Sequence, residues 1–580
     1  MKRIWELRYV LIVLLVASIF RLAFLDRAPS SISDDELMYV VDAKAIWNTG
    51  RNMTNAWSPF GFVNKATEFP HTELPHVLLA PIIGPVPFSL AWAHFPYAVS
   101  NILLVLALYF FAKKLFGNNV GFAVGIVAAI NPWNIFFGRT SFDATLSISF
   151  FMIGMCLVAY LKGKKILLLT IPFLLAFGTY IGTRTNFILF VGFCCYFGWR
   201  VVHNKKFMKY YLSVFLICTS ICLYYFATFH NLAVSARINE LFTPSSETVT
   251  NMVNSERRQA IQTPLTRFFA NKPVVFVRLC IDKYLQVFSP TTLFANGDYR
   301  ATFSLYRHGY FYYLDILFLG IGIFYIAKRH RNIFWFLLSI LLIAPIPAVA
   351  SQANTGFIAI RGILLFPILT IFIGAGIASF IDWSKKRKFK KQMIIILLLL
   401  YVILIANFIN IYAFQYPIYS SESYSFSSRI LSKYLVYANN EGKNIVVYTT
   451  SPKERFIYYL FFSSLYKNNI AKEIQQKFTN KQYLLNSIRF ENCLIDIKPD
   501  INTSYVIESG GCDKMKILLS QPRKTIPILA DGGSVYSIVG DTVCASFALP
   551  RYPNDIKFSD LSVEKLDKER FCTKFITEVK

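Results

Sequence analysis

Residues 9–25 read YVLIVLLVASIFRLAFL, and residues 33–36, a short distance further along the chain, read SDDE. The first stretch is apolar except for Arg21, and about 20 apolar residues are enough for a helix to cross a bilayer. The three carboxylates of the second stretch therefore follow the first predicted span at a membrane surface. Acidic side chains beside hydrocarbon are costly and are functional by default. Together the two stretches predict a membrane protein with an acidic site just outside its first span.

The acidic stretch also has a purely structural interpretation. Ser33 and Glu36 match the Ser-x-x-Glu capping box, and acidic residues stabilise the N-terminus of a helix. Capping accounts for these two residues but does not require Asp34 and Asp35 as well. The pattern therefore favours a catalytic or metal-binding role over capping alone.

The residues that follow, DDELMYVVDAKAIWNTG (34–50), predict an amphipathic helix that ends at Gly50. The side chains expected to lie against lipid are Leu37, Val40, Val41 and Trp47, while Asp42 and Lys44 face water. Such a helix would lie in the membrane interface and hold the carboxylates at the depth of the lipid headgroups.

The composition of the chain is typical of an integral membrane protein. The 580 residues are 55% hydrophobic and 17% aromatic, with a mean hydropathy of +0.44, which is too apolar for a soluble chain of this length. The formal net charge of +27 could suggest a nucleic-acid partner. Lys and Arg instead cluster in the short connectors between apolar runs, as the positive-inside rule expects for cytoplasmic loops. The basic character therefore reports membrane topology, and no nucleic acid is expected as a partner.

The apolar runs and basic connectors together predict eleven membrane helices. They are placed near residues 8–25, 93–112, 119–137, 144–161, 166–182, 186–202, 210–228, 311–327, 332–350, 360–381 and 392–412. Eleven crossings put the N-terminus in the cytoplasm and everything after residue 412 outside the cell membrane. The first span lacks a small-residue cleavage site followed by a soluble domain, so it is expected to be retained.

Nearly all of the polar sequence falls on the outer side of this topology, in loops 26–92 and 229–310 and in the tail 413–580. Loop 229–310 is expected to cap the active site. The tail has strand-like runs near 444–448, 492–497, 504–508 and 535–539 and a helical run through 453–466, which predict a small accessory α/β domain. The chemistry is therefore expected at the outer face.

Four cysteines of the tail, Cys493, Cys512, Cys544 and Cys572, are an even number in a compartment that permits disulfides. Three pairings are possible. Proximity in sequence favours Cys493 with Cys512 and Cys544 with Cys572.

Four sequence motifs resemble those of one enzyme family. They are Asp35-Glu36-Leu37-Met38-Tyr39, the stretch from Asn131 to Asp143 that contains Arg139, the pair Tyr180 and Arg184, and Ile360-Arg361-Gly362. This series resembles the outer-loop motifs of GT-C glycosyltransferases, nearest to protein O-mannosyltransferases and the aminoarabinose transferase of lipid A. The resemblance covers roughly residues 10 to 380. It implies an α-helical polytopic membrane protein with a GT-C fold over residues 1–412 and an extracytoplasmic α/β domain over residues 413–580.

The resemblance also implies a reaction. A dolichyl- or undecaprenyl-phosphate sugar would donate its glycosyl group to an acceptor hydroxyl, with inversion at the anomeric carbon and without a nucleotide cofactor. By its position in the motif Asp35 is the expected base, with Glu36 and Asp143 as further catalytic candidates. An inverting transfer needs such a base on the acceptor, and neighbouring like charge would raise its pKa usefully.

The departing phosphate calls for cations. Arg184, Arg361 and Arg139 all fall at outer helix ends of the predicted topology, and a guanidinium can bind phosphate through two parallel hydrogen bonds. An arginine at a helix end can instead reach toward lipid headgroups. Arg139 has a further alternative, an ion pair with Asp143 four residues on.

The family commonly uses a divalent cation. Oxygen-rich candidates favour Mg²⁺ or Mn²⁺, and the candidate ligands are Asp34, Glu73 and His308. The loop around Glu73 departs from the Lys-Pro-Pro-like stretch of the family, so Glu68 and His71 remain alternatives.

Two other functions remain open. An oligosaccharyltransferase or glycan ligase could use the same scaffold, although the Trp-Trp-Asp-Tyr-Gly signature of protein N-glycosylating enzymes is absent. A non-enzymatic transporter of lipid-linked glycans would instead place charges inside the helix bundle. The sequence leaves the sugar open, and the acceptor as a protein, a lipid or a glycan.

Overall fold

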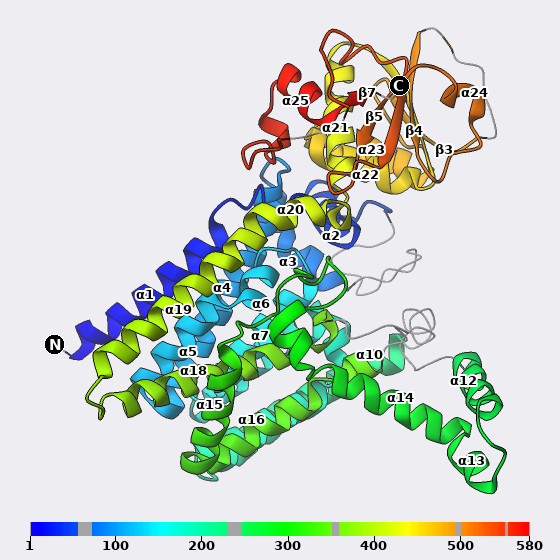
Figure 1. The fold of residues 1–580 in the computed structure, drawn as a ribbon. Helices are drawn as coiled ribbons and strands as arrows, with labels where there is room; N and C mark the ends of the chain where they lie inside the picture. The colour runs from blue at the N-terminus through cyan, green and yellow to red at the C-terminus, as the bar shows by residue number, and fades with distance from the viewer. Residues whose placement is uncertain are drawn as a thin grey trace.

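The computed structural model describes residues 2–55, 72–229, 246–350, 359–494, 500, 502–551 and 555–578. A body of long helices forms one part of the molecule, and a mixed β-sheet with its own helices lies at one end of that body (Figure 1). The N-terminus lies at the opposite end of the helical body from the sheet, and the C-terminus lies in the sheet (Figure 1).

The helical body comprises most of the α-helices. These are α1 (Lys2–Leu22), α2 (Asp34–Thr49), α3 (Glu73–Ile83), α4 (Leu90–Phe116), α5 (Asn118–Ile130), α6 (Pro132–Phe137), α7 (Asp143–Val158), α8 (Thr170–Thr179), α9 (Phe187–Phe197), α10 (Met208–Phe229), α12 (Ser246–Arg258), α13 (Pro264–Phe269), α14 (Lys272–Gln286), α15 (Asp315–Arg329), α16 (Arg331–Ile343), α17 (Ile346–Val349), α18 (Leu365–Ser384) and α19 (Lys390–Ile409). Short 3₁₀ or π turns connect them, namely η1 (Gly163–Leu169), η2 (Gly182–Thr185), η3 (Gly198–Val202), η5 (Thr291–Asn296), η6 (Ala359–Gly362) and η7 (Asn410–Gln415).

Each of the eleven predicted spans contains helical structure, with boundaries that differ by several residues. By length and composition, five helices in the described part of the chain are long and apolar enough to cross a membrane. They are Leu90–Phe116, Met208–Ala227, Arg331–Val349, Leu365–Ser384 and Lys390–Tyr419. The remaining crossings, and the side of the membrane that each end faces, stay predictions.

Glycines let two of the helices pack closely. A Cβ at Gly322 of α15 would lie 1.8 Å from the carbonyl oxygen of Phe372 in α18, and one at Gly376 of α18 would lie 1.9 Å from that of Phe318. Small residues allow such close helix contact in membranes, where packing replaces the hydrophobic driving force. This contact fixes the position of α18, which directly follows the turn η6.

The tail contains a seven-stranded sheet. Its strands are β1 (Asn444–Thr449), β2 (Leu484–Leu485), β3 (Ile488–Asn492), β4 (Thr503–Glu508), β5 (Arg523–Pro527), β6 (Ser534–Val539) and β7 (Thr577–Glu578). Their order is β2-β3-β1-β4-β6-β5-β7; β1 is parallel to β3 and β4, and the other pairs are antiparallel. Helices and turns of this part are α20 (Tyr416–Tyr419), η8 (Ser421–Tyr424), α21 (Phe426–Asn440), α22 (Pro452–Ser463), η9 (Asn468–Ile470), α23 (Ala471–Thr479), α24 (Lys516–Leu519), η10 (Val563–Lys565) and α25 (Lys568–Phe575).

The tail shares a hydrophobic core with the first loop of the chain. One cluster of buried side chains joins α2, α3 and the start of α4 to α21, α22 and the sheet. As a result α2 is covered by protein and does not rest on lipid as expected. Asp42, which accepts a hydrogen bond from the Met53 backbone N–H (2.9 Å), is only 3% exposed, and Lys44, which donates to the Gly84 carbonyl (3.0 Å), is 7% exposed. The expectation that both face water is wrong, because the pattern of the isolated helix does not include the tail and the rest of the first loop, which cover it.

Helices α12, α13 and α14 extend sideways from the helical body and lie far from α2 and the sheet (Figure 1). These three helices of loop 229–310 therefore do not cap the acidic stretch, whereas the end of the loop lies against the tail, where the Thr302 carbonyl accepts a hydrogen bond from the Tyr424 hydroxyl (3.0 Å). Tail helices α22 and α23 pack on α2 instead.

Candidate active site

The start of α2 is held by the capping box that the sequence predicts. Glu36 Oε2 accepts hydrogen bonds from the Ser33 backbone N–H (2.9 Å) and from Ser33 Oγ (2.7 Å). The first bond satisfies a backbone N–H that the helix start would otherwise leave unpaired, and the second links the two side chains of the capping box.

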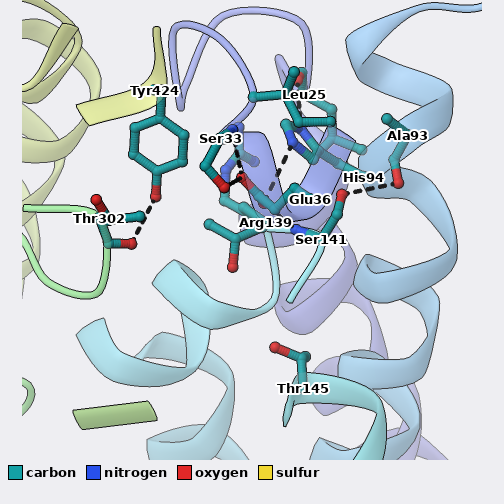
Figure 2. A network of polar contacts seen from close by, with 12 residues as sticks. Leu25, Ser33, Glu36, Ala93, His94, Arg139, Ser141, Thr145, Thr302 and Tyr424 are labelled. Atoms are coloured by element: carbon teal, nitrogen blue, oxygen red, sulfur yellow. Dashed lines mark hydrogen bonds and ion pairs between the residues drawn. The ribbon is translucent and has the colours of Figure 1, made fainter. Parts of the chain in front are cut away.

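Glu36 also ties α2 to the loop before α7. Its Oε1 accepts from the Ser141 backbone N–H, and the His94 Nε2 atom lies 4.0 Å away (Figure 2). The side chain is 0% exposed, and burial raises the pKa of Glu36 to about 7 although hydrogen bonds from Ser33 and Ser141 oppose the shift. Because both oxygens are occupied inside the protein, the structure favours a structural role for Glu36 over the predicted catalytic one.

Asp34 and Asp35, in contrast, are exposed and line a cleft of about 1100 Å³ between α2 and the tail. The opposite wall comes from α22, α23 and β3 and includes Lys453, Tyr458 and Lys481. Asp34 Oδ1 accepts a hydrogen bond of 2.7 Å from the Tyr458 hydroxyl. Asp35 therefore lies in the wall of an open cleft, next to Asp34, which is held by its hydrogen bond from Tyr458.

Arg455 of α22 is a cation near the acidic stretch that the sequence pattern does not predict. It donates to Glu508 (3.1 Å) and to Ser428 Oγ (3.0 Å). Burial alone would lower the pKa of Arg455, but the negative charges of Glu508 and Asp34 and the Tyr536 hydroxyl outweigh burial and raise it. Part of the negative charge at the start of α2 is therefore balanced from a helix more than 400 residues further along the chain.

Asp143, at the start of α7, lies inside the protein. Its Oδ2 accepts from the Tyr39 hydroxyl (2.7 Å) and lies 3.2 Å from Thr72 Oγ1, and the residue is 7% exposed. Tyr39 belongs to α2, as Asp35 does, so the hydrogen bond from Tyr39 to Asp143 connects α2 to the start of α7. This environment favours a positioning role over direct contact with an acceptor.

Arg139 does not serve phosphate in this structure. Its guanidinium donates to the carbonyls of Phe20, Arg21, Ala23, Phe24 and Ala28, and its Nε also reaches the Tyr412 hydroxyl (3.1 Å). The Phe20 and Arg21 carbonyls belong to the last turn of α1, where a helix leaves such groups unpaired, and the other three follow it. All three nitrogens are thus used to hold the end of α1, and the predicted role of Arg139 in phosphate binding, like its pairing with Asp143, is not supported by these bonds.

Arg184 lies in the turn η2. Its Nε donates to the Phe177 carbonyl (3.0 Å), an Nη donates to the Tyr225 hydroxyl, and the guanidinium stacks 4.3 Å from the centre of the Tyr225 ring. The side chain is held in one orientation by this stacking.

Arg361 lies in the turn η6. That turn is fastened by Asp298, whose Oδ2 accepts from the Ala359 backbone N–H (2.9 Å). Helix α17 packs against both η2 and η6, so the structure brings the two predicted arginines to one region. Helix α14 also packs on α17 and contributes Lys283, whose pKa is lowered by burial and by the nearby charge of Arg361. The sequence carried no signal for this third cation, because an isolated Lys in an amphipathic helix looks like any solvated residue.

The predicted metal ligands do not come together. Within the described ranges no group of three His, Cys, Asp or Glu side chains is placed to hold a metal ion. His308 Nδ1 lies 2.7 Å from the Gly309 carbonyl, and its ring packs edge-on against Tyr312 and Phe408. Asp34 is bonded to Tyr458, Glu73 begins α3, and Glu68 and His71 lie outside the described residues. The side chain of Glu73 is likewise outside the described part, so the divalent metal stays a prediction.

The tail cysteines are paired in the structure. Cys493 pairs with Cys512 and Cys544 with Cys572, with Cα–Cα distances of 5.2 and 5.5 Å. The second pair joins the loop after β6 to α25 and closes the tail around its core.

Comparisons with known proteins identify similar folds but no family by sequence. No family model matches the chain, and no curated protein matches it. The archaeal oligosaccharyltransferase AglB from Archaeoglobus fulgidus, in complex with an inhibitory peptide and a dolichol-phosphate, is 11% identical with a TM-score of 0.47, over 93% of this chain and 75% of that one. ArnT from Cupriavidus metallidurans bound to undecaprenyl phosphate is 10% identical with a TM-score of 0.44, over 92% of this chain and 98% of that one. At these identities and TM-scores the similarity assigns this chain neither a family nor the role of any residue.

Proposed function

We propose that this protein is an inverting glycosyltransferase that moves a sugar from a polyprenyl-phosphate donor to an acceptor hydroxyl at the outer face of the membrane. The observation that carries the proposal is the environment of Asp35. It is an exposed carboxylate at a fixed helix start, it lines a cleft of about 1100 Å³, and its neighbours Asp34 and Glu36 are both bonded to other groups.

This placement suits a base that acts on an acceptor. The acceptor hydroxyl would enter the cleft from the side of the tail and lose its proton to Asp35 as its oxygen attacks the anomeric carbon of the donor. The bond between that carbon and the phosphate oxygen breaks on the opposite face of the sugar, so the configuration inverts. Asp34 is held beside Asp35 by the Tyr458 hydroxyl, and its negative charge is partly balanced by Arg455.

The donor phosphate would bind at the second cationic region. Arg184 and Arg361 lie in turns that pack on the same short helix, α17, and Lys283 joins Arg361 there. A phosphate monoester that leaves with two negative charges is stabilised by such preorganised cations. The phosphate carries its own polyprenyl chain, so a site formed among apolar membrane helices suits this class of donor.

The test is sugar transfer by the full chain reconstituted with radiolabelled polyprenyl-phosphate sugars and native envelope acceptors. Asp35→Asn is expected to lower the rate by at least about 100-fold, since a positioned base contributes about 10²- to 10⁴-fold. Asp34→Asn is the matched control, because it removes the same charge one residue away and keeps an oxygen for Tyr458. A fall in rate of only a few fold is expected for this control.

Two results would contradict the proposal. Equal rates for wild type and Asp35→Asn would remove Asp35 as the base. An equal, large loss of transfer rate in both variants would show that the reaction depends on the total charge of the acidic stretch. It would not support a base at residue 35. Binding of the polyprenyl phosphate itself should be unchanged in Asp35→Asn and weakened in Arg361→Gln.

A further inference from the structure

Helices α13 and α14 carry an apolar face that no described part of the chain covers. On α14 the side chains of Val277, Ile281 and Leu285 are 53%, 51% and 59% exposed and recur every four residues, which places them on one stripe of the helix. On α13 Leu265 and Phe268 are 69% and 67% exposed. Exposed apolar side chains that gather in this way mark an interaction surface.

The opposite face of the same element is already packed. Val275 of α14 lies in a small core with Val249 and Val253 of α12. Arg278 of α14 forms an ion pair with Glu256 of α12. The three helices therefore form a folded unit, and the uncovered stripe is a feature of its outer side rather than of an unfolded segment.

The charges beside the stripe indicate which surface covers it. Between Ser246 and Gln286 the chain has six Lys and Arg residues against three Asp and Glu residues. Arg258, Arg267 and Lys272 are exposed at the ends of α12, α13 and α14. An apolar stripe flanked by basic side chains is the pattern of a helix that lies in the interface of a bilayer and contacts anionic headgroups.

The attachment of the unit points to the same surface. The Tyr284 hydroxyl, near the end of α14, donates to the Leu342 carbonyl (3.0 Å), which lies within the candidate membrane span Arg331–Val349. Helix α14 also packs on α17, at the end of that span. From this attachment α14 runs outward from the helical body for its 15 residues, about 22 Å, and carries α13 at its far end (Figure 1).

We propose that α13 and the stripe of α14 lie in the headgroup region of the bilayer, with Arg267 and Lys272 in contact with anionic lipid phosphates. The unit then acts as a lateral anchor that holds the molecule against the membrane surface on the side of Lys283 and Arg361. This inference concerns a lipid surface and does not depend on the proposed reaction.

The proposal is tested with nitroxide labels on the full chain in lipid nanodiscs. Single labels are placed at Phe268→Cys and Ile281→Cys, with Asn254→Cys on the exposed polar side of α12 as the matched control. Cys280→Ser is made in every variant, because Cys280 is the partly exposed free cysteine of the described chain and the other free cysteines are buried. Collisions with oxygen, which concentrates in lipid, are compared with collisions with an aqueous nickel chelate.

We expect an oxygen-to-nickel ratio at residues 268 and 281 at least threefold above that at residue 254. The ratio should rise further when phosphatidylglycerol replaces part of the phosphatidylcholine, and this rise should disappear in Arg267→Gln/Lys272→Gln. Nickel access at residues 268 and 281 equal to that at residue 254 would overturn the proposal. Labels shielded from both reagents would also overturn it, because they would indicate a second copy or another protein on the stripe. An oxygen-to-nickel ratio that is the same with and without phosphatidylglycerol would overturn the proposed contact with anionic phosphates.

Discussion

Helices α2 and α7 both begin with acidic residues, and the two starts differ in what surrounds them. At the start of α2, Asp35 is exposed in a cleft that the tail completes. At the start of α7, Asp143 is buried and accepts a hydrogen bond from Tyr39, which itself belongs to α2. Glu36 joins the two starts, because it is buried and accepts from the backbone of the loop before α7. An acidic residue at a helix start can therefore serve chemistry or hold the fold, and burial and partners distinguish the two roles.

The largest effect expected from this difference is a pH dependence that belongs to Glu36. Its pKa is about 7 in the folded protein and near 4.5 in an unfolded chain, so the folded state keeps the proton to higher pH. The contribution of Glu36 to stability is therefore fully present below pH 4.5 and is lost as the pH rises toward 7. The shift corresponds to a loss of up to about 3 kcal/mol in the free energy of unfolding.

Thermal unfolding of the purified protein between pH 4.5 and 8 measures this loss. Glu36→Gln, which does not titrate, should flatten the curve over that range even if its stability differs from that of the wild type at every pH. Asp35→Asn serves as the control and should keep most of the wild-type slope, because burial is the main cause of the raised pKa of Glu36 and the charge of Asp35 is a minor one. Parallel curves for wild type and Glu36→Gln would show that the fold does not shift the pKa of this carboxyl.

Replacing Asp143 should mainly affect folding. Asp143→Ala removes the carboxylate that accepts a hydrogen bond from the buried Tyr39 hydroxyl, and the loss of such a bond to a charged group costs about 2 kcal/mol. Adding Tyr39→Phe should recover part of this loss, so the double variant should be more stable than the sum of the two single changes predicts. Thermal unfolding of the four proteins gives the coupling. Transfer that collapses in Asp143→Ala while stability is unchanged would instead make Asp143 the base.

The sequence predicts the apolar helices well, because each one appears as a run of apolar residues bounded by charges or by Gly and Pro. It also identifies the start of α2 and the strands at 444–449 and 503–508, where the pattern is local. What it does not predict are contacts between segments far apart in the chain. The tail covers α2 because the two segments share one hydrophobic core, and the periodicity of either segment alone does not predict that contact. The hydrogen bonds of Arg139 could not be predicted for the same reason, because the Phe20 and Arg21 carbonyls that it binds belong to a helix more than 100 residues earlier.

The smallest effect concerns the part that the tail takes in the site. Tyr458 and Tyr459 are adjacent buried residues of α22, but the Tyr458 hydroxyl bonds Asp34, whereas the Tyr459 hydroxyl has no hydrogen-bond partner among the described residues. Tyr458→Phe should lower the transfer rate about fivefold, because a hydrogen bond of about 1 kcal/mol that orients the acidic stretch is lost.

Tyr459→Phe removes an equal hydroxyl from the same helix and should leave the rate within a factor of two. The split between kcat and KM then separates two roles for the tail. A loss in kcat with unchanged acceptor KM means that Tyr458 orients the carboxylates, and a rise in KM alone means that it forms part of the acceptor site. Equal effects of the two variants would show that the tail supports α2 only by packing, since the variants differ in the bonds that the Tyr458 hydroxyl makes to Asp34 and to the Ile32 carbonyl.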